Sequence, residues 1–183
     1  AHCDTISCCT HLGWDLCRSS GHVDLERGGR FAHYAQVFAV FHDAAKAPED
    51  GMYAEFLRQA NVFRAQMRAH SAYIQPCTTA EEFRRARESG KCAALLSVEG
   101  ADLLECDPKK IPSAAEYGVK MINLTWNRAN VLSGSNVEEP GRGLSDMGKE
   151  FVRRARRTGI LIDVSHLSDA GFWDLAEMEA GPI

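Results

Sequence analysis

Short apolar segments alternate with helical patterns along this chain, and this alternation constrains the fold more than any other feature. The run from Cys92 to Val98 is almost continuously apolar, which is typical of a strand buried on both faces. Strands that alternate with helices favour an α/β architecture with a parallel sheet. Further strands are expected over 1–4, 31–41, 119–125 and 160–165.

Helical spacing and capping residues predict the helices between these strands. Apolar side chains recur at helical spacing from 52 to 74, and Thr79 and Glu82 form a capping box for a helix that stops at Gly90. The segment between 4 and 31, rich in glycine and charge, is predicted to be a loop. A helical turn over 112–117, a polar loop over 127–143, and helices capped by Ser145 (149–157) and Ser168 (up to 181) complete the order.

This element order fits two architectures, an open doubly wound sheet and a (β/α)8 barrel. Five strands are predicted, and each ends in polar residues. The tripeptide from Gly181 to Ile183 follows a helix and is expected to lead into a sixth strand. Residues 1–183 are therefore interpreted as a single domain whose fold is expected to continue beyond Ile183, and both architectures stay open at this point.

The composition is that of an ordinary globular chain, with 45% hydrophobic and 25% charged residues among 183. A net charge of −4 argues against nucleic-acid binding, which normally requires a basic face. No apolar run approaches the roughly 20 residues of a membrane helix, and no signal peptide is visible. Seven cysteines without a C-x-x-C pair are interpreted as free thiols of a cytoplasmic protein.

Side chains that commonly bind metals stand where the predicted strands end. His2 and Asp4 are two residues apart on a strand, so both point to one face, and Glu99 and His166 each follow a later strand. Taken singly, these residues also fit a strand-end polar pair, a salt bridge and a loop histidine. Because parallel strands end at one face of a barrel, the four are expected to converge. Histidine and carboxylate ligands without cysteine favour a hydrolytic metal centre over a structural zinc site.

Trp126 and Asn127 follow the strand over 119–125 at the same face and are predicted to form a wall of the substrate pocket. A tryptophan that serves only in packing is the alternative for Trp126. Asp163 lies deeper in its strand and is interpreted as a structural hydrogen-bond acceptor. The other histidines are expected at the surface or in supporting positions: His11, His22, His33, His42 and His70.

Several of these segments together carry a resemblance to a known family. They are Ala1-His2-Cys3-Asp4-Thr5, Ser97-Val98-Glu99-Gly100, Asn123-Leu124-Thr125-Trp126-Asn127, Gly143-Leu144-Ser145 with Gly148-Lys149-Glu150, and Leu161-Ile162-Asp163-Val164-Ser165-His166. In these segments the sequence resembles the membrane dipeptidase (renal dipeptidase) family, peptidase M19, in its bacterial-type branch. The resemblance runs in order over essentially the whole chain.

The resemblance implies a (β/α)8 barrel with two zinc ions, present here as an N-terminal portion of about five β/α units. It implies that His2 and Asp4 bind the first zinc, that the catalytic Glu99 bridges both ions, and that His166 binds the second. Family members supply another histidine ligand, an arginine and an aspartate beyond position 183. The implied activity is hydrolysis of short dipeptides by a metal-bridging hydroxide, with a D-residue at the C-terminal side as a further expectation.

One position departs from the family pattern. Animal members carry a histidine where Trp126 stands. The resemblance therefore specifies the metal ions better than it specifies the substrate.

The alternatives to a dipeptidase are another metal-dependent barrel hydrolase, such as a lactonase or deaminase, and an inactive fragment or interaction subunit with an incomplete metal site. The expected partner is a dipeptide, with no nucleic acid and no membrane. A homodimer is left open, and the chain is expected to need the remainder of the barrel.

Overall fold

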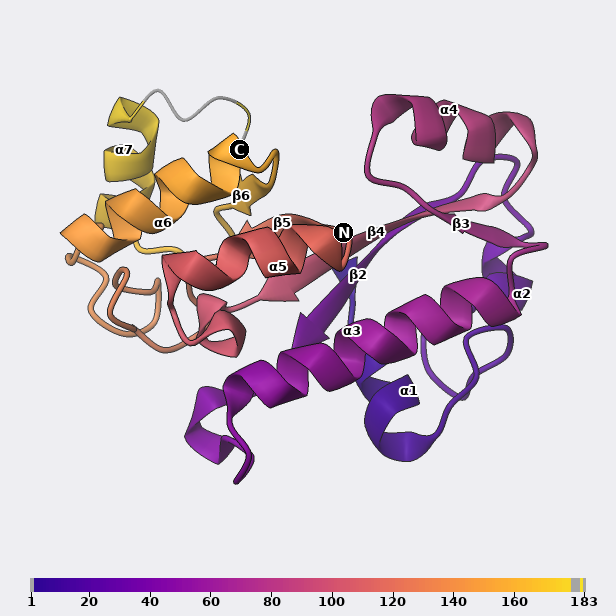
Figure 1. The fold of residues 1–183 in the computed structure, drawn as a ribbon, viewed down its shortest axis with the longest axis horizontal. Helices are drawn as coiled ribbons and strands as arrows, with labels where there is room; N and C mark the ends of the chain where they lie inside the picture. Colours follow the sequence, from indigo (N-terminus) through magenta and orange to yellow (C-terminus); the bar gives the residue numbers. More distant parts are fainter. Residues whose placement is uncertain (1, 179–181, 183) are drawn as a thin grey trace.

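The computed structural model describes residues 2–178 and Pro182, and a parallel sheet runs through it (Figure 1). Its strands follow the order β1-β2-β4-β5-β6, with β3 paired to the beginning of β4, and every strand pair is parallel. This confirms the predicted α/β class. The strands are β1 (His2–Cys3), β2 (Ala35–Phe41), β3 (Ile74–Pro76), β4 (Cys92–Glu99), β5 (Val119–Asn123) and β6 (Leu161–Asp163).

The centre of the sheet is β4, whose residues are buried apart from the half-buried Leu95. It pairs with β2 along its length, and Phe41 lies opposite Glu99. At the end of β5, Asn123 lies opposite Asp163. The carboxyl ends of the strands therefore meet at one edge, which is where side chains that follow the strands can converge.

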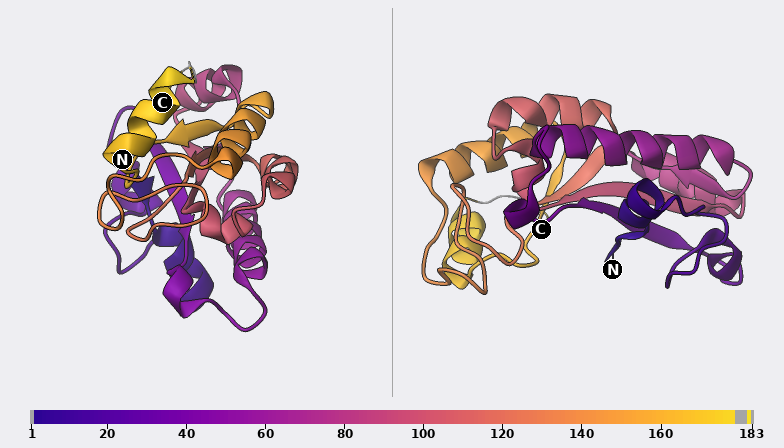
Figure 2. Two further views of the ribbon diagram at one scale, coloured as in Figure 1. Left: turned by 90° about the vertical axis from the view of Figure 1, so that its left-hand side faces the viewer. Right: turned by 90° about the horizontal axis from the view of Figure 1, so that it is seen from below.

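Helices of different lengths connect the strands. In the right-hand view of Figure 2, α3, α5 and α6 lie together on one face of the sheet. Phe38 of β2 and Phe63 of α3 lie 6.0 Å apart between ring centroids, so the apolar stripe of α3 packs on the sheet as expected. The helices are α1 (Thr5–Leu12), α2 (Leu25–Gly28), α3 (Met52–Ala69), α4 (Ala80–Glu88), α5 (Ile111–Glu116), α6 (Asp146–Arg157), α7 (Asp169–Glu177) and the 3-10 turns η1 (Ala44–Lys46), η2 (Ala101–Leu104) and η3 (Pro108–Lys110).

The long helix predicted over 52–74 is wrong at its C-terminal end. It stops at Ala69, and Ile74 begins β3, a strand that the sequence pattern did not reveal. Ile74 is buried. An apolar residue at this position fits both the stripe of a longer helix and the start of a strand. The pairing of β3 with β4 decides in favour of the strand, because this contact is made between segments distant in the sequence.

The prediction of a loop between 4 and 31 is also wrong, because α1 and α2 lie there. Helix α1 ends at Gly13, whose φ of 67° suits a glycine, and the side chain of Asp24 caps α2. The capping box of Thr79 and Glu82 is confirmed at the start of α4.

Several element bounds shift by a few residues. The strand expected from 31 begins at Ala35, those expected to end at 125 and 165 end at Asn123 and Asp163, and α6 begins at Asp146 rather than at 149. The predicted entry to a sixth strand includes Gly181 and Ile183, which lie outside the described residues.

Two further expectations concern the state of the cysteines and whether any helix could cross a membrane. All seven cysteines lie in the described part and are free thiols, four of them buried. Burial raises the pKa of the thiol of Cys9 to about 11 and that of Cys92 to about 12. Within the described ranges, no helix combines the length and apolar character that a bilayer crossing requires.

Candidate metal centre

A buried carboxylate lies between two histidines at the carboxyl edge of the sheet. Glu99 ends β4, and its side chain is 6% exposed. The Nε2 atom of His2 lies 3.4 Å from one carboxylate oxygen, Oε2, and the Nε2 atom of His166 lies 3.1 Å from the other, Oε1. Each oxygen of Glu99 therefore faces a different imidazole, one from β1 and one from the turn after β6.

Asp4 joins this group from the loop between β1 and α1. His2, Asp4 and Glu99 each offer one ligand atom, and these atoms lie within 4.8 Å of one another. Asp4 occupies the N-cap position of α1, but its side chain makes no capping hydrogen bond. Its carboxylate is thus not used by the helix and faces the cluster. All four sequence-predicted ligands meet at this edge.

The electrostatics of Glu99 reflect its burial. Loss of solvent raises the pKa of the Glu99 carboxyl above its usual value, His2 and His166 act in the opposite direction, and the nearby Asp4 carboxylate adds to the rise. Within residues 2–178, the ion pairs of Glu99 are those with the two histidines. A buried carboxylate without a lysine or arginine partner is costly unless a cation or proton neutralises it.

His166 is oriented by the loop that follows β5. Its Nδ1 atom lies 3.1 Å from the amide oxygen of Asn127, and this contact leaves Nε2 to face Glu99. The backbone of His166 is in the left-handed region with a φ of 66°, and its carbonyl oxygen accepts hydrogen bonds from the hydroxyl of Thr125 and the amide of Asn136. A ring nitrogen that donates to a neighbouring oxygen is the usual support of a metal-binding histidine.

Trp126 lies beside the same histidine. Its ring centroid is 6.3 Å from that of His166 and 4.9 Å from that of Phe41, and the side chain is half-buried. With Glu99 and Gly100, it lines a small hollow at this edge. Trp126 therefore both packs on β2 and borders the cluster. Asp163, by contrast, accepts a hydrogen bond from the amide of Ser165, as expected of a hydrogen-bond acceptor at this position.

The donor set fits a divalent cation. Two imidazoles and two carboxylates, with no thiolate, are ligands that suit a borderline ion such as zinc, and they are typical of hydrolytic rather than structural sites. The buried carboxylate presents both oxygens, which is the arrangement a bridging ligand needs. The chain thus contains residues that fit the metal expected from its sequence.

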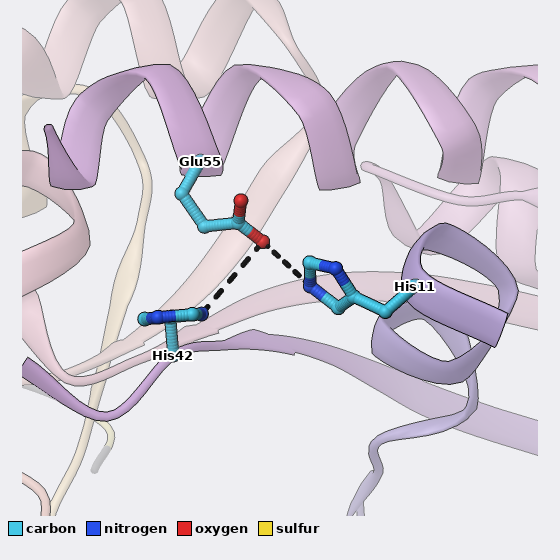
Figure 3. Close-up of side chains that lie close together, drawn as sticks. All are labelled: His11, His42 and Glu55. Carbon is cyan, nitrogen blue, oxygen red and sulfur yellow. Dashed lines mark ion pairs between the residues drawn. The ribbon is translucent and has the colours of Figure 1, made fainter. Parts of the chain in front are cut away.

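A second cluster, which was not predicted from the sequence, lies near this edge. It consists of His11 on α1, His42 after β2 and Glu55 on α3 (Figure 3). The signal in the sequence is that Glu55 falls within the apolar stripe of α3, next to Phe56 and three residues after Met52. A glutamate at such a position is buried and needs partners.

Comparison with known proteins shows the family of this chain. The family model of the membrane dipeptidases, peptidase family M19, matches residues 1–183. The chain belongs to this family. Dipeptidase tcpJ of Claviceps purpurea (strain 20.1) is 26% identical over 173 residues, which cover 90% of this chain and 41% of that protein.

Solved structures of similar proteins share the fold. A metallopeptidase from Rhodobacter sphaeroides, liganded with a phosphinate mimic of the dipeptide L-Ala-D-Ala, has a TM-score of 0.82 at 23% identity. The match covers 96% of this chain and 60% of that one. The probable dipeptidase PvdM from Pseudomonas aeruginosa has a TM-score of 0.77 at 24% identity, with 88% and 44% covered. The fold is thus of the (β/α)8 type expected, and the chain covers part of it.

The relatives are longer than this chain, so the matches cover only part of each relative. The chain spans between 41% and 60% of the length of the curated relatives it matches.

Proposed function

We propose that this chain forms part of a zinc-dependent dipeptidase and that His2, Asp4, Glu99 and His166 hold its metal ions. Membership of the membrane dipeptidase family supports a hydrolase of this type. The observation that carries the proposal is the position of Glu99, whose two oxygens face His2 and His166 at 3.4 and 3.1 Å. A carboxylate so placed can bridge two ions, with His2 and Asp4 on one side and His166 on the other.

The residues of this chain hold and orient the reacting groups. When bound, two divalent ions would lower the pKa of a water molecule so that hydroxide attacks near neutral pH, and would polarise the scissile carbonyl. Glu99 fixes the spacing of the two ligand groups from its buried position on β4. Asn127 holds the ring of His166, and Trp126 forms an apolar wall beside them.

We propose short dipeptides as substrates, including those with a D-residue at the C-terminal side. The metallopeptidase from Rhodobacter sphaeroides binds a mimic of L-Ala-D-Ala, and it shares the fold of this chain. Trp126 offers a flat apolar surface and an indole N–H donor, so it favours substrates with an apolar group at this wall.

The test is amino-acid release from a panel of L,L- and L,D-dipeptides by the full-length protein, first stripped of metal and then reloaded with Zn²⁺. Hydrolysis that depends on Zn²⁺ and falls by at least about 10³-fold in the Glu99→Gln variant is expected. The exposed His22→Gln serves as the matched control and is expected to retain wild-type rates. The absence of hydrolysis of any dipeptide after zinc is restored, or cleavage only of lactones, would reject the proposal.

Assembly and location belong to the same proposal. We also propose a cytoplasmic location, because seven cysteines without a C-x-x-C pair are interpreted as free thiols of a reducing compartment. The absence of a nucleic-acid partner and the option of a homodimer also stay predictions.

A further inference from the structure

Three elements bring His11, His42 and Glu55 together, and Figure 3 shows both imidazoles directed at the carboxylate. The Nε2 atom of His11 lies 2.8 Å from Oε1 of Glu55, and the Nδ1 atom of His42 lies 3.9 Å from the same oxygen. Glu55 is 1% exposed, whereas the side chain of His11 is 45% exposed. A buried carboxylate oxygen thus faces two ring nitrogens, with access from solvent on the side of His11.

The hydrogen bond on the far side of His42 fixes its tautomer. Its Nε2 atom lies 2.8 Å from the carbonyl oxygen of Lys46, which can only accept, so Nε2 carries the proton. In the neutral ring, Nδ1 is then a lone-pair acceptor that faces the carboxylate oxygen of Glu55. Two acceptors at 3.9 Å repel each other unless a cation or an added proton lies between them. A backbone carbonyl behind the ring is also the support usual for a metal-binding histidine.

The charges around Glu55 leave the cluster negative. Arg58 donates to the other oxygen of Glu55, Oε2, but it also pairs with both oxygens of Asp50. One guanidinium therefore pairs with two carboxylates. With neutral histidines, Arg58, Asp50 and Glu55 together carry a net charge of about −1. Burial raises the pKa of Glu55, but hydrogen bonds from Gln59 and Arg58 outweigh it, so the pKa lies below its usual value and the carboxylate is ionised.

The spacing of the three ligand atoms fits a small cation. Tetrahedral zinc with bonds of about 2.0–2.1 Å separates its ligand atoms by about 3.3 Å. The two separations from Oε1 of Glu55, 2.8 and 3.9 Å, lie on either side of that value. One ligand atom of each residue lies within 4.8 Å of those of the other two. Binding of a cation would lengthen the separation between His11 and Glu55 and shorten that between His42 and Glu55.

We propose that His11, His42 and Glu55 form an additional site for one zinc-type divalent cation, with the fourth position open to solvent. The ion would join α1, α3 and the end of β2. His42 also lines the hollow that Glu99 and Trp126 border, so the site lies next to the candidate metal centre while using ligands of its own. Two imidazoles and one carboxylate with an open position match the ligand type of a non-structural zinc site.

The test measures zinc bound per chain of the full-length protein at neutral pH, by elemental analysis after removal of free Zn²⁺. His11→Gln and His42→Gln are each expected to lose one equivalent of zinc relative to wild type. The matched control is His22→Gln, which alters an exposed histidine outside the cluster and is expected to keep the wild-type number. Circular dichroism establishes that each variant is folded, and His11 is exposed enough for its replacement to be tolerated.

A second comparison separates this site from the candidate metal centre. In the Glu99→Gln background, zinc bound through His11, His42 and Glu55 is expected to remain, and it should disappear when His11→Gln is added. Equal zinc content in wild type, His11→Gln and His42→Gln would overturn the proposal and leave the cluster as an ion-pair network with a protonated His42. Retention of zinc in the Glu99→Gln/His11→Gln variant at the level of Glu99→Gln would overturn it as well.

Discussion

At the scale of single residues, Asn127 determines how His166 is presented to Glu99. Its amide oxygen holds Nδ1 of His166 at 3.1 Å, and Nε2 of the same ring lies 3.1 Å from Glu99. The backbone carbonyl of Asn127 is fixed in turn by the hydroxyl of Ser135, at 2.8 Å. The loop over 127–143 therefore sets the orientation of a proposed ligand, which is the reason to test it by substitution.

Asn127→Ala is expected to weaken zinc binding about 10- to 100-fold, the effect typical of removing the partner of a ligating histidine. The ring of His166 would lose its hydrogen bond but keep its backbone contacts. Isothermal titration with Zn²⁺ measures the affinity. Asn136→Ala is the control, because Asn136 contacts His166 through its backbone amide and its side chain is exposed. Equal affinities for wild type and Asn127→Ala would remove the positioning role of Asn127.

The four proposed ligands were predictable because each lies at or just after the carboxyl end of a strand, and parallel strands end at one face. Strand alternation predicted that His2 and Asp4 lie together, and they do, although Asp4 lies just after β1 as the N-cap of α1. The contact between Asn127 and His166 was not predictable. It depends on a left-handed backbone at His166, and the two residues are 39 positions apart in the sequence. The partners of Glu55 were hidden for a similar reason, since they come from two other elements.

At the scale of elements, α6 packs closely under the loop over 127–143. A Cβ atom at Gly148 would lie 2.3 Å from the carbonyl oxygen of Leu132, a backbone atom that cannot move aside easily. The amide of Ser145, the N-cap of α6, also donates to that oxygen. The helix therefore requires glycine at this position, in spite of the low helix propensity of glycine.

Gly148→Ala is expected to lower the free energy of unfolding by about 1–3 kcal/mol, because the clash outweighs the gain of roughly 1 kcal/mol in helix propensity. Chemical denaturation of the full-length protein measures the change. Gly141→Ala, where a Cβ atom meets nothing within 4 Å, is the matched control and should be nearly neutral. An unchanged or increased stability of Gly148→Ala would show that the loop does not rest on α6.

Helix α2 depends on the carboxylate of Asp24. This buried side chain accepts hydrogen bonds from the amide and the guanidinium of Arg27 and from the amide of Ser19. The hydrogen bond from the Arg27 side chain is the largest cause that lowers the pKa of Asp24, from 3.8 to about 2. Because the folded-state pKa is lowered, the stabilisation is complete above the ordinary pKa and is lost as the pH falls toward 2.

Asp24→Ala is therefore expected to lower the free energy of unfolding by roughly 1–3 kcal/mol near neutral pH. The difference from wild type should shrink as the pH falls below 3.8. Denaturation curves across that range check both statements. Asp24→Asn keeps a capping side chain and is expected to lose less. A difference that is constant with pH would contradict the role of the charge.

The elements themselves were largely predictable where local signals were strong. The capping box at Thr79 and the apolar run of β4 specify their segments by local chemistry. The end of α3 was not predictable, since Ile74 is apolar whether it continues a helix or begins β3, and only the pairing with β4 distinguishes the two. The short helices α1 and α2 are fixed by Asp24, Gly13 and their packing rather than by periodicity.

At the scale of the whole molecule, the described sheet ends at β1 on one side and at β6 on the other. Leu161 on β6 is 42% exposed. In a closed barrel both edges would be paired, whereas open edges bind further strands. This chain covers 60% and 41% of two of its relatives, so those proteins contain additional chain.

The 183-residue chain by itself is therefore expected to self-associate in a concentration-dependent way, whereas the full-length protein should have a defined size. Sedimentation velocity at several concentrations of each compares them. A monodisperse monomer of the 183-residue chain at every concentration would contradict this expectation and would require another way of covering the edges.

The central claim is that Glu99 binds metal through both oxygens, between His2 and His166. The most direct measurement is an anomalous difference map at the zinc absorption edge from crystals of the full-length protein grown with Zn²⁺. We predict zinc peaks within bonding distance of both oxygens of Glu99, one peak adjoining His2 and Asp4 and the other adjoining His166. A map in which no peak lies within bonding distance of Glu99 would contradict the account.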